Sequence, residues 1–146
     1  MMRIDFAGRE SEGVFRFVPP MPAGADSVDE LPTVLIATKH VREKNAFLGA
    51  CASALDFPEY FGQNWDSFYD CLTDLRQKFE SGLIVVFDDL SGFARAGPEE
   101  FHAALDAMVD AVDYWRERDT KLTVLIGIDQ PVLAPQLPEL SLRPPG

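Results

Sequence analysis

No lysine or arginine occurs between Asn45 and Leu75, although this stretch carries five acidic residues. Three of them, Asp66, Asp70 and Asp74, recur every fourth residue and would share one side of a helix, where each like-charge pair costs about 0.2–0.5 kcal/mol. Aromatic residues lie among these carboxylates: Tyr60, Trp65 and Tyr69. Because nothing within the stretch neutralises the acidic charge, we infer a surface that binds a cationic partner.

Other scarcities exclude whole classes of protein. The chain has two cysteines, Cys51 and Cys71, too few for a disulfide framework or a cysteine-rich metal site, and we expect two buried free thiols. No apolar run approaches the roughly 18 residues of a membrane helix, and the first residues lack the apolar segment of a secretory signal. No glycine-rich phosphate loop is present. We therefore expect a cytoplasmic protein that holds no cofactor and does not enter a membrane.

The net charge of −11 bears on the type of partner. Direct binding of nucleic acid requires lysine and arginine to neutralise phosphates, so this charge argues against it. It favours a basic protein partner, and it also serves solubility. The 146 residues, 47% of them hydrophobic, suffice for one domain with a proper core, which we expect to be a monomer when free.

The hydrophobic pattern predicts an α/β fold with a small three-stranded parallel sheet packed with helices, because buried strands alternate with helical crossovers. The three strands are expected at residues 33–37, 83–87 and 121–126, and the helices at 42–55, 65–79 and 99–118. Asn64 is a suitable N-cap for the second helix. Alternating runs at residues 3–6 and 14–18 predict an extra N-terminal strand or hairpin segment.

These patterns divide the chain into three parts. Residues 1–32 form an N-terminal extension, and residues 33–128 form the main domain. Residues 129–146 are rich in proline, and we expect an irregular C-terminal tail there.

The run FPEYFGQNWDSFYDCLTD, from Phe57 to Asp74, resembles the signature of the barstar family, intracellular inhibitors of the ribonuclease barnase. That signature has the form LPEYYGxNxDALxDCLT, and the match contains no gap. The order strand, helix, signature, strand, helix, strand over residues 33–128 is also similar to the family. The resemblance implies a barstar-like fold and a stoichiometric inhibitor, an antitoxin or immunity protein, that blocks a basic, barnase-like ribonuclease and catalyses nothing.

The resemblance also implies which residues bind the partner. Asp70 stands in the place of the family's central aspartate, which enters the ribonuclease active site where a substrate phosphate would bind. Asp66 matches a second contacting carboxylate, and Tyr60 matches a loop tyrosine that packs on a catalytic histidine. Three further positions match family contacts: Gly62 and Asn64 in the loop, and Tyr69, where the family often has tryptophan. Carboxylates suit this role because arginine side chains bind them bidentately, as they bind phosphate.

Two positions depart from the family pattern. Leu75 stands where the family has an interfacial tryptophan, so that aromatic contact is missing. For the acidic contact on the last helix, ungapped counting back from the final strand gives Tyr114, and Asp113 is its neighbour. We favour Asp113, because a carboxylate fits the role.

Two other functions are compatible with the sequence. An acidic interaction module would use the same surface to bind a partner that is not a ribonuclease. A Mg²⁺-dependent hydrolase would use Asp66 together with Asp88 and Asp89, which follow a strand, although turn and helix-capping chemistry explains that pair more simply. His40 and His102 have no neighbouring nucleophile or metal-ligand spacing, so we expect no catalytic site around them.

Overall fold

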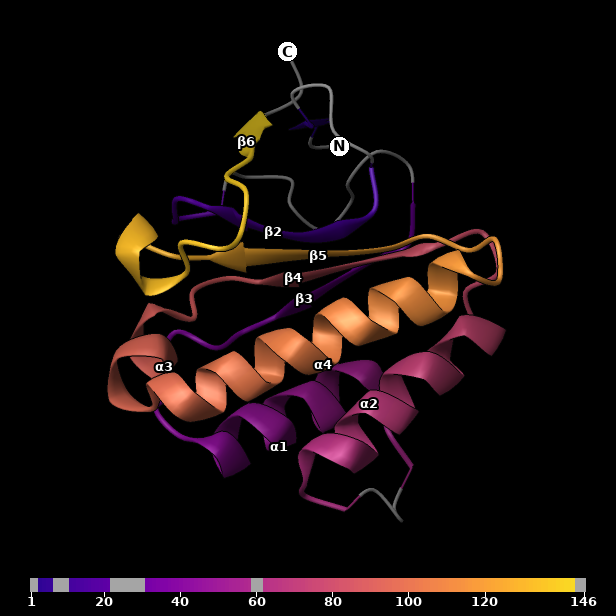
Figure 1. The fold of residues 1–146 in the computed structure, drawn as a ribbon, viewed down its shortest axis with the longest axis horizontal. Coiled ribbons are helices and arrows are strands. Elements are labelled where there is room, and N and C mark those ends of the chain that lie inside the picture. The colour runs from indigo at the N-terminus through magenta and orange to yellow at the C-terminus, as the bar shows by residue number, and fades with distance from the viewer. Residues whose placement is uncertain (1–2, 7–10, 22–30, 59–61, 144–146) are drawn as a thin grey trace.

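The computed structural model describes residues 3–6, 11–21, 31–58 and 62–143. Its middle layer is a four-stranded parallel sheet, in the order β2 (Gly13–Phe17), β5 (Leu122–Gly127), β4 (Leu83–Phe87) and β3 (Thr33–Ile36). The helices cover one face of this sheet (Figure 1): α1 (Lys44–Leu55), α2 (Trp65–Asp74), α3 (Ser91–Ala96) and α4 (Pro98–Arg116). On the other face, β1 (Arg3–Asp5) pairs antiparallel with β6 (Ser141–Arg143).

The predicted α/β class and the parallel sheet are confirmed. The three strands expected in the main domain are β3, β4 and β5, and the extra N-terminal strand is β2, which adds a fourth parallel strand beside β5. The N-terminal strands do not form a hairpin with each other, because β1 pairs with β6. The second helix is shorter than expected: α2 ends at Asp74 and continues as the 3-10 turn η1 (Leu75–Gln77).

The expectation of an irregular C-terminal tail is wrong in part. After a 3-10 turn, η2 (Pro131–Leu133), the chain returns to the open edge of β2. There the Arg16 N–H donates to the carbonyl of Pro138 at 2.9 Å, and the Leu140 N–H donates to the carbonyl of Arg16 at 2.8 Å. β6 then follows. The tail therefore satisfies backbone groups along the edge of β2 that would otherwise stay unpaired.

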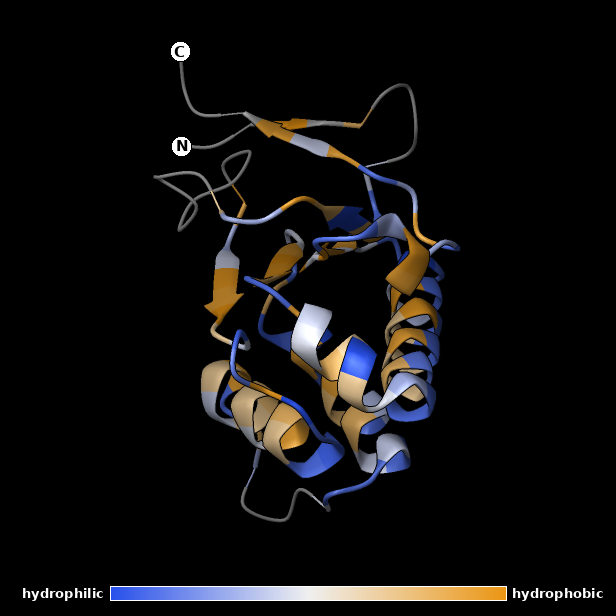
Figure 2. Cartoon of the chain, turned by 90° about the vertical axis from the view of Figure 1, so that its left-hand side faces the viewer, coloured by the Kyte–Doolittle hydropathy of each residue, from blue (hydrophilic) through white to orange (hydrophobic). Residues whose placement is uncertain are grey.

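The core has two parts because the sheet is covered on both faces. On β4, Leu83, Val85 and Phe87 join the cluster beneath the helices, whereas Ile84 and Val86 join a second cluster on the other face. The strand is buried throughout, as its continuous apolar run predicts. Figure 2 shows the sheet strands as mainly hydrophobic and the helices as hydrophobic on one side and hydrophilic on the other.

Helix α4 is apolar on one face and acidic on the other. Apart from Ala107, its buried residues recur at the spacing of one helix face: Phe101, Ala104, Leu105, Met108, Ala111, Val112 and Trp115. Beyond its first turn, its carboxylates lie on the opposite face: Asp106, Asp110, Asp113 and Glu117, the last directly after the helix. Packing of the apolar face against the sheet therefore directs a row of negative charge outward, beside α2.

An acidic groove between α2 and α4

An open groove of about 780 Å³ runs between α2 and α4. Among the residues that the structure describes, six carboxylates line it and no lysine or arginine does: Asp66 and Asp70 from α2, and Asp106, Asp110, Asp113 and Glu117 from the side of α4. The remaining lining residues are aromatic or small: Trp65, Tyr69, Ala103, Ala107 and Tyr114. We call this surface the acidic groove. Carboxylates beside aromatic faces are chemically suited to guanidinium and ammonium groups.

A loop with its own hydrogen bonds sets the start of α2. The Asn64 side chain is the N-cap, as predicted, and its oxygen accepts from the Ser67 N–H at 2.8 Å. The Ser67 hydroxyl in turn accepts from the Gly62 N–H at 3.0 Å, and the Asn64 N–H donates to the Gly62 carbonyl at 2.9 Å. Gly62 and Asn64 are thus fixed to the first turn of the helix that carries Asp66.

Two substitutions of Asn64 test how much its capping of α2 contributes to stability. We expect Asn64→Ala to lower the free energy of unfolding by about 1 kcal/mol, because one main-chain N–H of α2 loses its acceptor. Asn64→Asp keeps an acceptor at the cap and should retain wild-type stability. Denaturant unfolding of both variants measures the difference, and equal losses for alanine and aspartate would contradict the capping role.

Trp65 connects the acidic groove to the core. Its ring packs in a tilted arrangement on Phe47 at 5.9 Å and edge-to-face on Phe68 at 5.8 Å, between ring centroids. Its indole N–H donates to the Glu100 carboxylate at 2.8 Å, which ties α2 to the first turn of α4. Trp65 therefore packs inward on one side of its ring, while the residue also lines the acidic groove.

A second tie holds the far ends of the two helices together. Trp115 of α4 is fully buried, and its indole N–H donates to the Leu72 carbonyl of α2 at 3.0 Å. This carbonyl lies in the last turn of α2, where main-chain acceptors lack partners within the helix. The two tryptophans thus fix the spacing of α2 and α4, and with it the width of the acidic groove.

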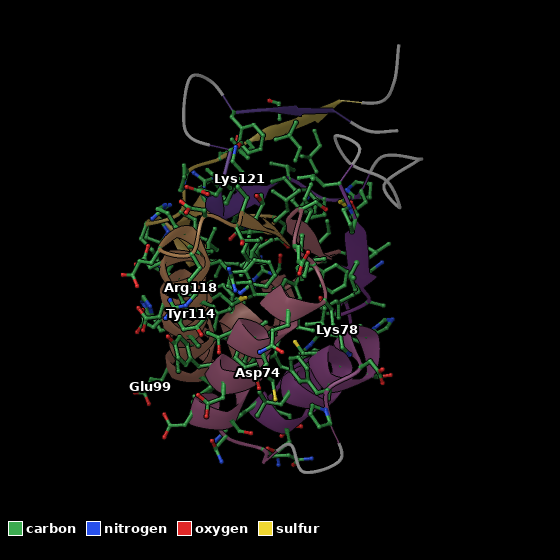
Figure 3. All side chains as sticks on the ribbon, turned by 90° about the vertical axis from the view of Figure 1, so that its right-hand side faces the viewer. Asp74, Lys78, Glu99, Tyr114, Arg118 and Lys121 are labelled. Atoms are coloured by element: carbon green, nitrogen blue, oxygen red, sulfur yellow. The ribbon has the colours of Figure 1, made fainter. Side chains whose placement is uncertain are left out.

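Tyrosines from both helices give the acidic groove hydrogen-bonding capacity. Burial raises the pKa of the Tyr69 hydroxyl, and the charge of Asp110 raises it further, while Arg118 opposes this shift. Tyr69 therefore stays protonated at neutral pH and can donate a hydrogen bond. Beyond the end of α4, the Arg118 guanidinium lies 3.6 Å from the centre of the Tyr114 ring (Figure 3). This cation–π contact holds Arg118 against the Tyr114 ring at the end of the groove.

The structure brings together four of the predicted partner-binding residues. Asp66, Tyr69, Asp70 and Asp113 all line the acidic groove, and Tyr114, the alternative to Asp113, does so as well. Two more precede α2 and position its first turn: Gly62 and Asn64. The seventh falls outside the described residues: Tyr60.

Two residues of the same sequence run lie elsewhere. Asp74 lines a different hollow, with Asp56 and Lys78, on the other side of α2. Leu75 is 5% exposed and belongs to the core. The position of the missing interfacial tryptophan is thus filled by a packing residue.

Sequence reasoning missed three carboxylates of the acidic groove, Asp106, Asp110 and Glu117. With Asp113 they follow one another at steps of four, three and four residues, the same kind of helical spacing that links Asp66 to Asp70. That spacing is a usable signal for one acidic helix face. It does not reveal that the face lies beside α2, which follows from how both helices pack on the sheet.

The carboxylates considered for Mg²⁺ do not come together. The Asp88 carboxylate accepts from the N–H and hydroxyl of Thr38, at 2.7 and 3.0 Å, and Asp89 accepts from the Ser91 N–H at 2.9 Å. Both therefore act in turns and at the start of α3, whereas Asp66 lines the acidic groove. Across the described ranges, no group of three or more histidine, cysteine or acidic side chains is arranged to hold a metal ion.

The two cysteines are free and buried, as expected. Burial raises the pKa of both thiols, Cys51 and Cys71, so they are protonated at neutral pH. Within the described part of the chain, no helix has the length and apolar character needed to cross a membrane.

Fold and groove together define a small α/β protein that presents an acidic, aromatic surface on two helices. The family described as Barstar (barnase inhibitor) matches residues 31–127, more than half of the chain. The chain therefore belongs to the barstar family, and the resemblance carried by the Phe57–Asp74 run is confirmed. The family is one of inhibitors of barnase-like ribonucleases and not of enzymes. A search of curated proteins returned no match to the chain.

Proposed function

We propose that the chain is a stoichiometric inhibitor of a barnase-like ribonuclease, acting as an antitoxin or immunity protein in the cytoplasm of the cell that makes the enzyme. The observation that carries this proposal is the acidic groove on a protein of the barstar family: within the described part of the chain its lining has six carboxylates and no basic side chain. A ribonuclease presents cations around the phosphate it cleaves. Carboxylates placed where phosphate oxygens would bind occupy those cations and exclude RNA.

The carboxylates on α2 are available for this role. Within the described ranges, the side-chain oxygens of Asp66 and Asp70 accept no hydrogen bond and form no ion pair, and both residues are exposed. A partner arginine therefore does not have to displace an internal partner. We assign Asp70 to the substrate-phosphate position and Asp66 to a second ion pair, with Tyr60, Gly62, Asn64, Tyr69 and Asp113 as further contacts.

Electrostatics favours fast capture as well as affinity. The net charge of −11 and the clustering of six carboxylates on one surface steer a basic enzyme toward the acidic groove. Such steering weakens as salt screens the charges. The association rate with the partner should therefore fall as ionic strength rises.

Titration of barnase with the purified chain tests the proposal. Cleavage of a fluorogenic RNA substrate should fall linearly with added chain and reach zero near one chain per enzyme, because inhibition is stoichiometric. Lysozyme, a basic protein without ribonuclease activity, is the control for binding by charge alone. Undiminished cleavage at a large excess of the chain contradicts inhibition of barnase, and equal affinity for lysozyme would favour the alternative of an acidic interaction module.

A further inference from the structure

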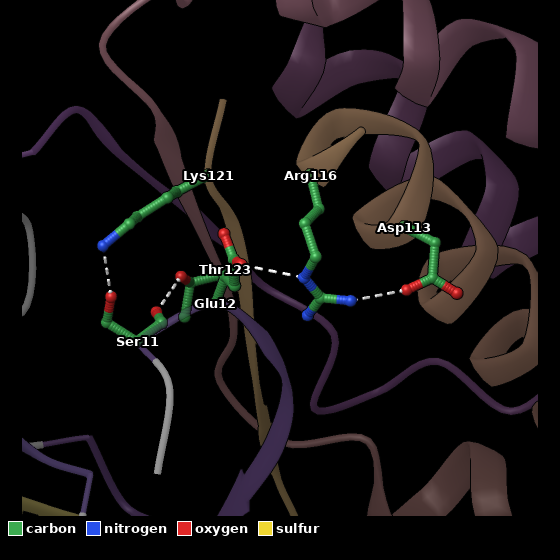
Figure 4. Close-up of polar contacts among 6 residues, drawn as sticks. All are labelled: Ser11, Glu12, Asp113, Arg116, Lys121 and Thr123. Atoms are coloured by element: carbon green, nitrogen blue, oxygen red, sulfur yellow. Dashed lines mark hydrogen bonds and ion pairs between the residues drawn. The ribbon is translucent and has the colours of Figure 1, made fainter. Parts of the chain in front are cut away.

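Arg116, the last residue of α4, links the acidic groove to the N-terminal segment. Its Nη1 donates to the Asp113 carboxylate at 2.8 Å, and its Nε donates to the Glu12 carboxylate at 2.8 Å (Figure 4). Asp113 lines the acidic groove, whereas Glu12 directly precedes β2 and lies outside residues 31–127 that match the family. One guanidinium thus joins a groove residue to a segment that is additional to the family domain.

Glu12 is the fixed end of this link. The neighbouring Ser11 carbonyl accepts from the Thr123 hydroxyl at 2.6 Å, and the Ser11 hydroxyl accepts from the Lys121 ammonium at 2.8 Å. The Glu12 side chain is 14% exposed, against 43% for Arg116 and 55% for Asp113. The start of β5 therefore holds Glu12 in place, and Glu12 in turn holds the more exposed Arg116.

The charges of the three side chains decide what this link does. Arg116 paired with Asp113 alone would cancel the charge of a groove carboxylate. Glu12 offsets Arg116, so the three groups keep a net negative charge. Glu12 also draws the guanidinium from the opposite side, which limits its approach to the acidic groove. Asp113 lines the acidic groove and Arg116 does not. A small movement of Arg116 toward or away from Asp113 therefore changes the negative potential that Asp113 presents to a partner in the groove.

We propose that Glu12 is a positioning residue that shares Arg116 with Asp113, so that Asp113 keeps part of its negative charge for arginine-rich ligands although Arg116 contacts it. The N-terminal segment thereby sets part of the affinity of the groove. The inference rests on the proposed function only in taking the partner to be cationic. The proposal predicts opposite effects of the two residues: Glu12 strengthens the binding of cations to the groove, and Arg116 weakens it.

Calorimetric titration with an oligoarginine peptide, at about 0.15 M ionic strength, tests these effects on the full chain. At this ionic strength charges beyond about 8 Å are screened, so distant substitutions have little effect. Glu12→Gln should weaken peptide binding about two- to fivefold, the range expected for an exposed ion-pair network. Arg116→Gln should tighten it, and adding Glu12→Gln to Arg116→Gln should change little further. Glu139→Gln is the matched control, because Glu139 also pairs with an arginine, Arg16, but does not line the groove.

Opposite signs separate this role from a merely structural one, since damage to the fold would weaken binding in both single variants. Weaker binding in both, or equal effects of Glu12→Gln and Glu139→Gln, overturns the proposal. So does a peptide that binds without perturbing the NMR signals of Tyr69 and Asp70 in the acidic groove. Inhibition of barnase is measured in a separate experiment. If the chain does not inhibit barnase, the proposed function is contradicted, but the peptide titrations still test the role of Glu12.

Discussion

Asp70→Ala should weaken the complex with barnase by several kcal/mol, the largest loss expected from any single change in the acidic groove. In the barnase–barstar complex itself, close charge pairs couple by about 1.5–7 kcal/mol, and we take that range over for Asp70. The physical reason is that removing the carboxylate leaves enzyme cations desolvated and unpaired at the centre of the contact. Inhibition constants of the variant and the wild type, measured on the same RNA substrate, give the difference.

Two comparisons make this result specific. Asp74→Ala removes the same charge from the same helix, but Asp74 does not line the acidic groove, so binding should change by less than about 1 kcal/mol. Stability of Asp70→Ala should stay at or slightly above the wild-type value, because the exposed carboxylate has a like charge one turn away on either side. Equal inhibition by Asp70→Ala and the wild type would show that this aspartate is not the phosphate mimic.

Trp115→Ala should lower the free energy of unfolding by about 3–5 kcal/mol, the largest expected effect on stability. The change opens a cavity in the core and deletes the indole bond to the Leu72 carbonyl. Domains are stable by about 5–15 kcal/mol, so this variant approaches the limit of folding. Binding should fall with it, because Trp115 fixes α2 against α4. Denaturant unfolding measures the first effect and barnase titration the second.

Trp115→Phe separates the two contributions of the tryptophan. Phenylalanine keeps most of the apolar contact but leaves the Leu72 carbonyl without the indole donor, a loss of about 1–3 kcal/mol. The phenylalanine variant should therefore retain inhibition while losing part of the stability. A Trp115→Ala variant that unfolds within about 1 kcal/mol of the wild type would show that other contacts set the spacing of the helices.

The elements with a strong local pattern could be predicted from the sequence. The continuous β-branched run of β4 and the apolar stripe of α4 mark a buried strand and a one-sided helix, and the structure has both. The Asn64 cap was equally accessible, because its chemistry is confined to one turn. Asp66 and Asp70 were found together for the same reason: a single helix determines their relation.

Features that depend on distant parts of the chain could not be predicted in this way. The alternating run at residues 3–6 predicted a strand where β1 lies, but not its pairing with β6, a three-residue strand too short to show a period. The six residues of α3 include a glycine and show no helical stripe. α2 ends at Asp74, earlier than its apolar stripe suggests, and carboxylates near a helix C-terminus oppose the helix dipole. The meeting of α2 and α4 across the acidic groove likewise requires the tertiary fold.

The position of β2 in the sheet has a consequence for the order in which the protein assembles. β2 is synthesised well before its partner in the sheet, β5, which lies more than a hundred residues later in the chain. Contacts so distant in sequence form slowly, and during translation β2 cannot pair until β5 has emerged. β3 and β4 can meet beforehand. β2 is therefore made before its partner strand and docks late, and the Glu12 contact beside the acidic groove is completed with that final step.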